Sequence, residues 1–280
     1  MRLADVNSRV MKELAEKLTA ANLSAATIRD YLNNSKVVVA SATDENGEEL
    51  FPRRWNAEFI DAPPIRDQRQ PSTNAEGMIA IVGTATGQYQ MLRALLAGCG
   101  PMRAGEALGL DIDKHISPDF RTLYIRQKAK QGIIQDHLKT ENGKRDVDLC
   151  RPLADMLRGY VGTRTSGLLF HTASGKQLSQ RNILRACLHP ILKKLGLERG
   201  GLNIFRRFRI THVGKSDCPE ALKHFWSGHA QRHVSERYTK LLQELEYRLD
   251  WAGRIGLGFE LSTKSEVGRP GRFIMFRKVG

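Results

Sequence analysis

Apolar side chains recur at intervals of three or four residues near the start of the chain, a spacing that predicts amphipathic helices. The first helix is predicted over residues 6–21, with an apolar face formed by Val6, Val10, Met11, Leu14, Leu18 and Ala21. Ser24 can cap a second helix that runs to about residue 42, with an apolar side formed by Ile28, Tyr31, Leu32 and Val38. Gly47 ends this pattern, and residues 48–60 are expected to form an irregular arm.

A proline-rich stretch separates this N-terminal part from the rest. Residues 61–72, DAPPIRDQRQPS, combine three prolines with charged side chains and have no hydrophobic period. Such a composition is typical of an inter-domain linker. The sequence therefore predicts a small helical domain over residues 1–60, a linker over 61–72, a larger domain over 73–252 and a basic, glycine-rich tail over 253–280.

The larger domain is predicted to be mostly helical. Thr73 and Glu76 form a capping-box pattern ahead of a helix that ends near residue 85. Helical spacing then recurs over residues 88–96, 103–110, 152–161, 179–195, 204–213, 219–226 and about 233–251. Alternating patterns over 123–126 and 145–149, and near Ile112, predict a small antiparallel sheet with a basic connecting segment, KAKQGIIQDHLKTENG. The expected fold class is therefore mostly α with a small antiparallel β-sheet (α+β).

The net charge indicates the class of partner that the protein binds. The chain of 280 residues has a formal net charge of +14, and 41% of its residues are hydrophobic, as in ordinary globular proteins. Residues 1–72 carry 10 basic and 11 acidic side chains, whereas the remainder carries 34 basic and 19 acidic ones. A strongly basic domain favours a polyanionic partner, with nucleic acid first and an anionic membrane surface second. A basic surface that binds nothing is the simpler alternative.

The sequence lacks membrane, export and metal-binding motifs, and this predicts where the protein is found and what it binds. No apolar run is long enough to cross a bilayer, and the first ten residues have no signal-peptide core, so we expect a cytoplasmic protein. The four cysteines are scattered without metal-ligand spacing, which is typical of reduced structural thiols. His229 and His233 have the spacing of half a zinc site, but the glutamate of that motif and a third ligand are missing. We therefore expect no metal and no other cofactor.

Arginine, histidine and tyrosine at wide spacing indicate candidate chemistry. Arg206, His229 and Tyr238 lie between residues 203 and 240, and together they could hold phosphate oxygens and attack phosphorus. Upstream, Arg103 opens a short helix behind two glycines, and Glu106 lies one turn further, where it can pair with Arg103. Taken singly, each of these residues could equally be an ordinary surface or core side chain.

In combination these motifs resemble the tyrosine recombinases, the phage-integrase family, from Thr73 to about Leu242. The stretch GPMRAGEALGL is similar to the first-arginine motif of that family, which implies roles for Arg103 and, as its supporting acid, Glu106. The segment HLKTENGKRDVDL is similar to the hairpin that carries the family's lysine, which corresponds to Lys139, with Lys144 close behind.

The second half of the resemblance covers the stretch with the reactive side chains. The family's second motif is His-x-x-Arg, and here it reads Asn203-Ile-Phe-Arg206. The segment GHAQRHVSERYTK is similar to the part that holds a second histidine and the nucleophile, which implies His229 and Tyr238. Residues 1–60 resemble part of the helical DNA-clamping (core-binding) domain that precedes the catalytic domain in this family.

The resemblance implies a site-specific DNA recombinase or integrase that needs neither metal nor nucleotide. Tyr238 would attack a DNA phosphodiester to give a 3′-phosphotyrosyl link, Arg103, Arg206 and His229 would hold the phosphate, and Lys139 would protonate the leaving 5′-oxygen. Asn203 cannot titrate near neutrality, so we expect it to position groups while another neighbour or water removes the proton. The implied partners are double-stranded DNA and, as a homotetramer on paired sites, further copies of the chain, with location at the nucleoid.

The residues leave two alternatives open. Nicking and closing of DNA without strand exchange, as in type IB topoisomerases, would use similar chemistry. A truncated or decayed DNA-binding remnant without catalysis is the other, and it is favoured by Asn203 and by the short N-terminal part. The segment after Tyr238, LLQELEYRLDWA, is amphipathic and could dock on a neighbouring copy or on its own domain.

Overall fold

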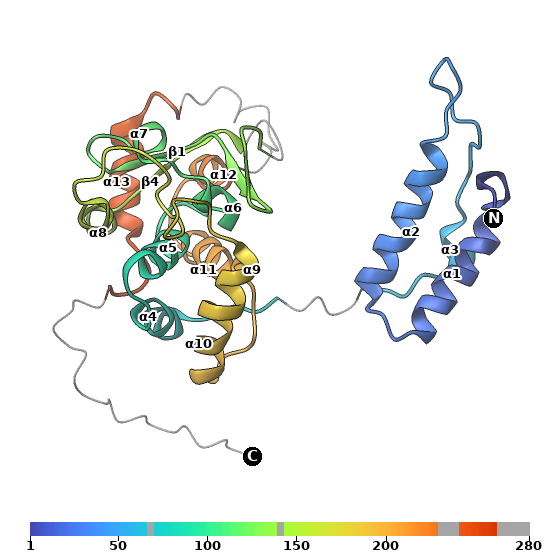
Figure 1. Ribbon diagram of the computed structural model, residues 1–280, viewed down its shortest axis with the longest axis horizontal. Helices are drawn as coiled ribbons and strands as arrows, with labels where there is room; N and C mark the ends of the chain where they lie inside the picture. Colours follow the sequence, from blue (N-terminus) through green and yellow to red (C-terminus); the bar gives the residue numbers. More distant parts are fainter. Residues whose placement is uncertain (66–69, 139–142, 229–240, 262–280) are drawn as a thin grey trace. The chain divides into compact units, whose positions relative to one another are not determined.

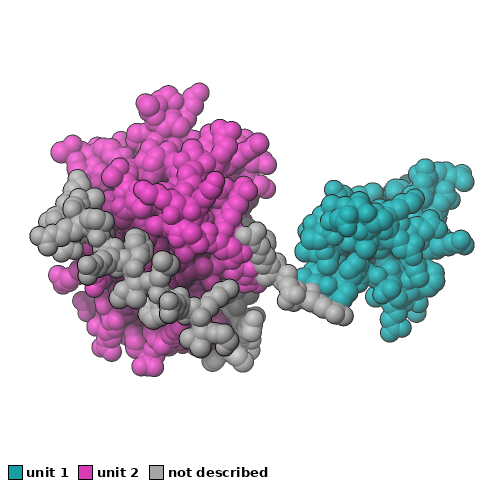
Figure 2. All heavy atoms as spheres, turned by 90° about the horizontal axis from the view of Figure 1, so that it is seen from below, with its two compact units in different colours: residues 1–69 teal, residues 70–280 magenta. Residues whose placement is uncertain are grey.

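The computed structural model describes residues 1–65, 70–138, 143–228 and 241–261, which form two compact units divided between Arg69 and Gln70 (Figures 1 and 2). Helices dominate both units, and the strands are few and short, as the sequence predicts. None of the helices in this described part is long and apolar enough to cross a bilayer.

The first unit is a helical pair with a short return helix. Its elements are η1 (Leu3–Asp5), α1 (Ser8–Ala20), α2 (Ala25–Ala40) and α3 (Ala57–Ile60). Ser24 caps α2 as predicted, because its hydroxyl accepts a hydrogen bond from the backbone N–H of Thr27 at 3.2 Å. Its core is formed by Val6, Met11, Ala15, Ile28, Leu32, Val39 and Ile60.

Two predictions for the first unit are wrong in detail. Tyr31 and Val38 are 52% and 53% exposed rather than on the apolar side of α2. The buried face runs through Ile28, Leu32 and Val39, since the unit covers this helix on one side only. The arm over residues 48–60 is also not wholly irregular, because it ends in α3, where the Asn56 side chain accepts from the N–H of Phe59 at 2.9 Å.

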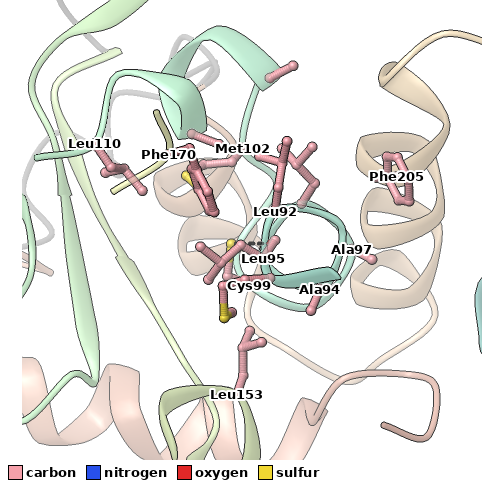
Figure 3. Close-up of a cluster of buried hydrophobic side chains, with 14 of the residues drawn as sticks. Leu92, Ala94, Leu95, Ala97, Cys99, Met102, Leu110, Leu153, Phe170 and Phe205 are labelled. Atoms are coloured by element: carbon pink, nitrogen blue, oxygen red, sulfur yellow. Dashed lines mark hydrogen bonds between the residues drawn. The ribbon is translucent and has the colours of Figure 1, made fainter. Parts of the chain in front are cut away.

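The second unit is built around α5 (Gly87–Gly98), in which every residue from Met91 to Gly98 is buried. A helix that is buried on all sides lies at the centre of a large domain. It packs against α4 (Ala75–Gly83), α6 (Ala104–Leu108), α8 (Arg151–Val161) and α11 (Asn203–Gly214). Figure 3 shows the result: Leu92 and Leu95 lie in the interior, and Phe205 of α11 lies beside Ala97.

The predicted antiparallel pairing of 123–126 with 145–149 is present as a two-stranded sheet, and the described residues form a second two-stranded sheet that the sequence does not predict. Strand β1 (Thr122–Ile125) pairs with β4 (Arg145–Asp148), with Thr122 opposite Asp148 and Ile125 opposite Arg145. A hairpin of β2 (Lys128–Lys130) and β3 (Ile133–Gln135) forms within the stretch that was expected to be a connection. Its turn has positive φ at Gln131 and Gly132, a conformation that glycine adopts without strain.

The predicted strand near Ile112 is wrong, because residues Ile112–His115 form the short helix α7. His115 lies at the end of α7, and its Nδ1 accepts a hydrogen bond from the N–H of Asp111 at 3.0 Å, which closes this single turn. Isolated bridges on either side, from Asp111 to Leu168 and from Ile116 to Leu123, explain the strand-like pattern around it.

The remaining helices follow the predicted order with shifted ends. They are α9 (Gln180–Asn182), the π-helical segment η3 (Ile183–Leu188), α10 (His189–Lys194), α12 (Glu220–Ser227) and α13 (Leu245–Ile255). The cap of α4 is Asn74 rather than Thr73, since its side chain accepts from the N–H of Gly77 at 2.9 Å. Of the predicted helix over about 233–251, the part up to residue 240 lies outside the described residues, residues 241–243 form a turn, and α13 covers the rest.

Candidate active site

A salt bridge within one turn shapes the start of α6. Arg103 is the N-cap residue, and the carboxylate of Glu106 accepts from its backbone N–H at 2.7 Å and from its Nη1 at 2.9 Å. The side chain of Glu106 is 3% exposed, whereas that of Arg103 is 40% exposed. The buried acid thus fixes an arginine whose guanidinium still reaches the surface. This is the pairing that the sequence predicts.

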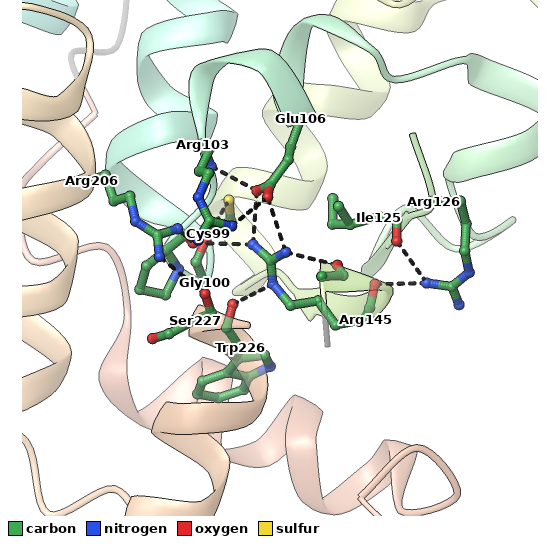
Figure 4. Close-up of polar contacts among 12 residues, drawn as sticks. Cys99, Gly100, Arg103, Glu106, Ile125, Arg126, Arg145, Arg206, Trp226 and Ser227 are labelled. Carbon is green, nitrogen blue, oxygen red and sulfur yellow. Dashed lines mark hydrogen bonds and ion pairs between the residues drawn. The ribbon is translucent and has the colours of Figure 1, made fainter. Parts of the chain in front are cut away.

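A third residue, for which the sequence pattern predicts no role, holds Glu106 from the other side. Arg145 of β4 donates from Nη2 to Glu106 at 2.9 Å and from Nη1 to the same carboxylate at 3.3 Å, and its side chain is 2% exposed (Figure 4). It also donates to the carbonyl oxygens of Pro101, Gly143 and Trp226. Arg145 therefore joins the loop before α6, the strand β4 and the end of α12.

Glu106 is held as a carboxylate despite its burial. Burial by itself would raise the pKa of Glu106, but the adjacent Arg145, its hydrogen bonds and those from Arg103 outweigh burial and lower that pKa. A buried charge needs such compensation from partners and hydrogen bonds. The negative charge of Glu106 in turn stabilises two guanidinium groups close together.

Arg206 approaches the same place from α11. Its guanidinium donates from Nη1 to the carbonyl oxygen of Pro101 and from Nη2 to that of Ser227 at 3.0 Å, and the residue is 9% exposed. Burial and the nearby Arg103 lower the pKa of Arg206 to about 10, so the group keeps its charge near neutrality. Figure 4 shows Arg206 and Arg103 side by side above the loop that carries Gly100.

Both guanidinium groups line an open cavity of about 740 Å³. Asn203 lines it too, one helical turn before Arg206 and exposed at the start of α11. The rest of the wall includes the basic or polar residues Lys128, Lys130, Gln180 and Arg207, together with the apolar Leu138, Leu184, Leu202 and Ile210. A cavity with this lining can hold an anion that needs several N–H donors.

Two glycines, Gly105 in α6 and Gly109 directly after it, let the β2 strand approach the cavity. A Cβ atom on Gly105 would lie 2.8 Å from the carbonyl oxygen of Ala129, and one on Gly109 would lie 3.1 Å from the backbone of Lys128. Gln127 fixes the same approach, because its Nε2 donates to the oxygen of Gly109 at 2.6 Å. This close backbone contact fixes the strand that carries Lys128 and Lys130, which line the same cavity as Arg206.

Three of the predicted site residues lie outside the described part of the chain. These are Lys139, His229 and Tyr238, and their roles stay predictions. The described residues beside them lie near the site: Leu138 lines the cavity, and Ser227 accepts from Arg206. Within the described ranges, no group of three or more His, Cys, Asp or Glu side chains is arranged to hold a metal ion.

The fold has counterparts among solved structures. The integrase of transposon Tn1549 in complex with a circular-intermediate DNA matches with a TM-score of 0.63 at 16% identity, over 87% of this chain and 85% of that chain. The XerH site-specific recombinase bound to its difH substrate matches with a TM-score of 0.54 at 18% identity, over 86% of this chain and 69% of that one. An integrase from mycobacterium phage Brujita matches with a TM-score of 0.50 at 14% identity, over 92% and 95% of the two chains.

No protein-family model matches the sequence, and no curated protein matches it. The solved structures are similar in fold at sequence identities of 14–18%. The class that the structure defines is therefore one of fold: a mostly helical chain with small antiparallel sheets, arranged as in integrases and site-specific recombinases. This is the fold that the motif resemblance predicts.

Proposed function

We propose that this protein is a site-specific DNA recombinase or integrase that cleaves and rejoins DNA through a 3′-phosphotyrosyl intermediate. The observation that carries the proposal is the pair of guanidinium groups, Arg103 and Arg206, in one open cavity and backed by the buried carboxylate of Glu106. Support comes from the fold, which is similar to a transposon integrase and to a recombinase, each solved with DNA.

Double-stranded DNA is the proposed partner. The net charge of +14 and the arginines and lysines in the cavity wall suit a phosphate backbone, and contacts of this kind make binding strongly dependent on salt. Action as a homotetramer on two paired duplexes, with location at the nucleoid, completes the proposal. The amphipathic segment after Tyr238 docks in part on its own unit, since Ala252 and Ile255 of α13 pack with Leu222 and Trp226 of α12.

The proposed step exchanges one phosphate ester for another. The Oη atom of Tyr238 loses its proton and forms a bond to phosphorus. The bond from phosphorus to the 5′-oxygen breaks, and Lys139 gives a proton to this leaving oxygen. Arg103 and Arg206 donate to the nonbridging oxygens, where negative charge increases in the transition state. His229 adds a further donor.

Asn203 does not act as a base in this scheme. Its amide can donate and accept hydrogen bonds but does not titrate near neutrality. We assign it a positioning role at the mouth of the cavity, where it is exposed and one turn from Arg206. Removal of the tyrosine proton then falls to water, His229 or another neighbour.

The test is capture of the covalent intermediate on nicked suicide DNA, from which the short cleaved strand diffuses away. The wild-type chain should form a protein–DNA adduct that Tyr238→Phe does not form, while both bind the DNA equally. An adduct that persists in Tyr238→Phe would contradict the nucleophile assignment. A wild-type chain that binds DNA but forms no adduct would indicate a non-catalytic DNA-binding remnant instead.

Strand exchange is tested separately from cleavage. Substrates with one and with two copies of the recognition site distinguish the recombinase from a nicking-closing enzyme of the topoisomerase IB kind. A recombinase gives exchanged product only when two sites are paired. Relaxation of supercoiled DNA that is equally fast without any paired site would favour the nicking-closing activity.

A further inference from the structure

One buried carboxylate lies where two distant segments of the second unit meet. Asp148 is the last residue of β4, and it is 1% exposed. Its Oδ2 accepts from the indole Nε1 of Trp226 at 2.8 Å and from Nε of Arg248 at 2.9 Å. Trp226 belongs to the last turn of α12, and Arg248 belongs to the first turn of α13.

The contacts on the α12 side fix the end of that helix. Trp226 is 1% exposed, and besides its bond to Asp148 its carbonyl oxygen accepts from Nε of Arg145 at 2.7 Å. The next residue, Ser227, accepts from Arg206 at 3.0 Å. Gly228 then has a left-handed conformation that ends the helix. The backbone up to residue 228 is thereby tied to β4 and to Arg206.

The contacts on the α13 side fix the start of the following segment. Arg248 is 1% exposed, and its Nη1 donates to the carbonyl oxygens of Leu241 at 2.8 Å and Leu242 at 3.1 Å. Its Nη2 lies 3.4 Å from Oδ1 of Asp148, so that the guanidinium meets both oxygens of this carboxylate. Residues 241 and 242 are thereby held, through Arg248, to the same strand as residue 226.

We propose that Asp148 is a positioning residue for DNA cleavage, because its carboxylate ties together the described residues on either side of the segment 229–240: Trp226 before it, and Leu241 and Leu242 after it through Arg248. The inference rests on the proposed function, in which His229 and Tyr238 of that segment act on the phosphate. The carboxylate is well suited to the task, since an ionised side chain has about four acceptor positions. Thr122, Trp226 and Arg248 occupy them, with Oγ1 of Thr122 at 2.9 Å.

The geometry also provides matched variants. Trp226→Phe removes the indole donor on the α12 side and keeps an aromatic ring in the core. Asp148→Asn removes the charge that attracts Arg248 and keeps the shape. Thr122→Val removes a third hydrogen bond to the same carboxylate from β1, a strand that carries neither end of the segment 229–240. It therefore serves as the control.

Three quantities are to be measured for each variant with nicked suicide DNA: the single-turnover rate of adduct formation, the Kd for DNA and the Tm. We expect Asp148→Asn to cleave about 10²-fold more slowly than the wild type, because a small misplacement of reacting groups costs a factor of this order. Trp226→Phe should cleave about 10-fold more slowly than the wild type, while the cleavage rate of Thr122→Val stays within about threefold of the wild-type rate. The Kd should change by less than about threefold in all of them, since the cavity wall is untouched.

Loss of folding is separated from loss of positioning by a double variant. Asp148→Asn leaves the buried Arg248 with Asp146, 3.5 Å away, as its remaining acid. Asp148→Asn with Arg248→Met removes both members of the Asp148–Arg248 pair, while Asp146 keeps its pair with Arg126, so this double variant should regain stability. We expect this double variant to fold and bind DNA but to stay slow in cleavage. A double variant, or a folded Asp148→Asn variant, that cleaves within about threefold of Thr122→Val would overturn the positioning role. A wild-type chain that forms no adduct overturns the proposed function itself and the inference with it.

Discussion

Arg145 and Glu106 form a buried ion pair across 39 residues of sequence, with both side chains at most 3% exposed and Nη2 2.9 Å from Oε2. The pair lies directly beneath Arg103, because the same carboxylate also accepts from the guanidinium and the backbone N–H of that residue. One acid therefore links a structural arginine to an arginine that faces the cavity.

Removal of either partner of this pair should destabilise the second unit strongly. Arg145→Met and Glu106→Gln each leave a buried charge with less compensation, and we expect each to lower the free energy of unfolding by about 3–5 kcal/mol. The double variant should lose less than the sum of the two, by about 1–3 kcal/mol, because neither buried charge of the pair is then left without the other. Urea unfolding followed by tryptophan fluorescence measures all four proteins. Strict additivity would contradict direct coupling of the two side chains.

The same pair predicts how stability depends on acid. The pKa of Glu106 in the folded state is below its ordinary value of 4.5, since Arg145 and Arg103 outweigh the effect of burial. The unfolded chain thus takes up a proton near pH 4.5 that the folded chain does not. The stabilisation from Glu106 is fully present above that pH and is lost as the pH falls towards its folded pKa. In Glu106→Gln, the urea midpoint should therefore fall less steeply between about pH 6 and pH 3 than in the wild type.

Much of the fold follows from hydrophobic spacing, and its errors have physical reasons. Helices with an apolar stripe, such as α1 and α8, were predicted from the sequence to within a few residues. The sequence places Tyr31 and Val38 wrongly because α2 is covered on one side only, so some of its apolar residues lie outside the buried face. The hairpin of β2 and β3 was missed because its apolar residues, such as Ile133, are exposed and give no inward alternation.

The candidate site was predictable where its partners are close in sequence. Glu106 follows Arg103 by one helical turn, so their salt bridge could be expected. Arg145 could not be found in this way, since Glu106 is distant in sequence and the pattern Arg145-Asp-Val-Asp148 alternates as in a half-exposed strand. All four of these residues are buried, because long-range ion pairs and hydrogen bonds compensate the charges. The roles of Lys139, His229 and Tyr238 stay predictions.

The two cavity arginines should respond differently to replacement by lysine. Lysine keeps the charge but loses the planar fork, so in both variants we expect cleavage to slow by about 10²–10³-fold. Arg103→Lys should keep the wild-type Tm, because that side chain is 40% exposed and contacts one acid. Arg206→Lys should also lower the Tm, because the buried guanidinium donates to the carbonyl oxygens of Pro101 and Ser227.

Arg126→Lys is the control for this pair of variants. Its side chain is 41% exposed and pairs with Asp146 at 2.7 Å, but it does not line the cavity. Rates of adduct formation and thermal melts of the three proteins should separate phosphate binding from general loss of an arginine. If Arg126→Lys slowed cleavage as much as Arg103→Lys, the assignment of Arg103 to the phosphate would fail.

Because α6 and β2 are in close contact, alanine at Gly105 should have the opposite effect on stability to alanine at the open position Gly159 of α8. Gly105→Ala would place a Cβ atom 2.8 Å from the backbone oxygen of Ala129, so we expect a loss of about 1–3 kcal/mol in the free energy of unfolding. Gly159→Ala, at an exposed position within α8 with no heavy atom within 4 Å of the new Cβ, should gain about 0.5–1 kcal/mol. Gly105→Ala should also weaken DNA binding, because displacement of β2 moves Lys128 and Lys130. Unchanged stability and DNA affinity in that variant would argue against a rigid contact.

Asn203 offers the sharpest test of how Tyr238 loses its proton. It is exposed and lines the cavity one turn from Arg206, so Asn203→His should fold like the wild type. An imidazole at this position has an ordinary pKa of about 6.5, so the variant gains a base that asparagine cannot provide. We expect its adduct to form about 10²-fold faster above pH 7 than that of the wild type, with a rate that rises across about pH 6–7. Asn203→Gln, which keeps the amide, is the control and should show no such rise. If Asn203→His is no faster than the wild type at any pH, an impaired base at residue 203 is contradicted, and the proton must leave by way of water, His229 or another neighbour.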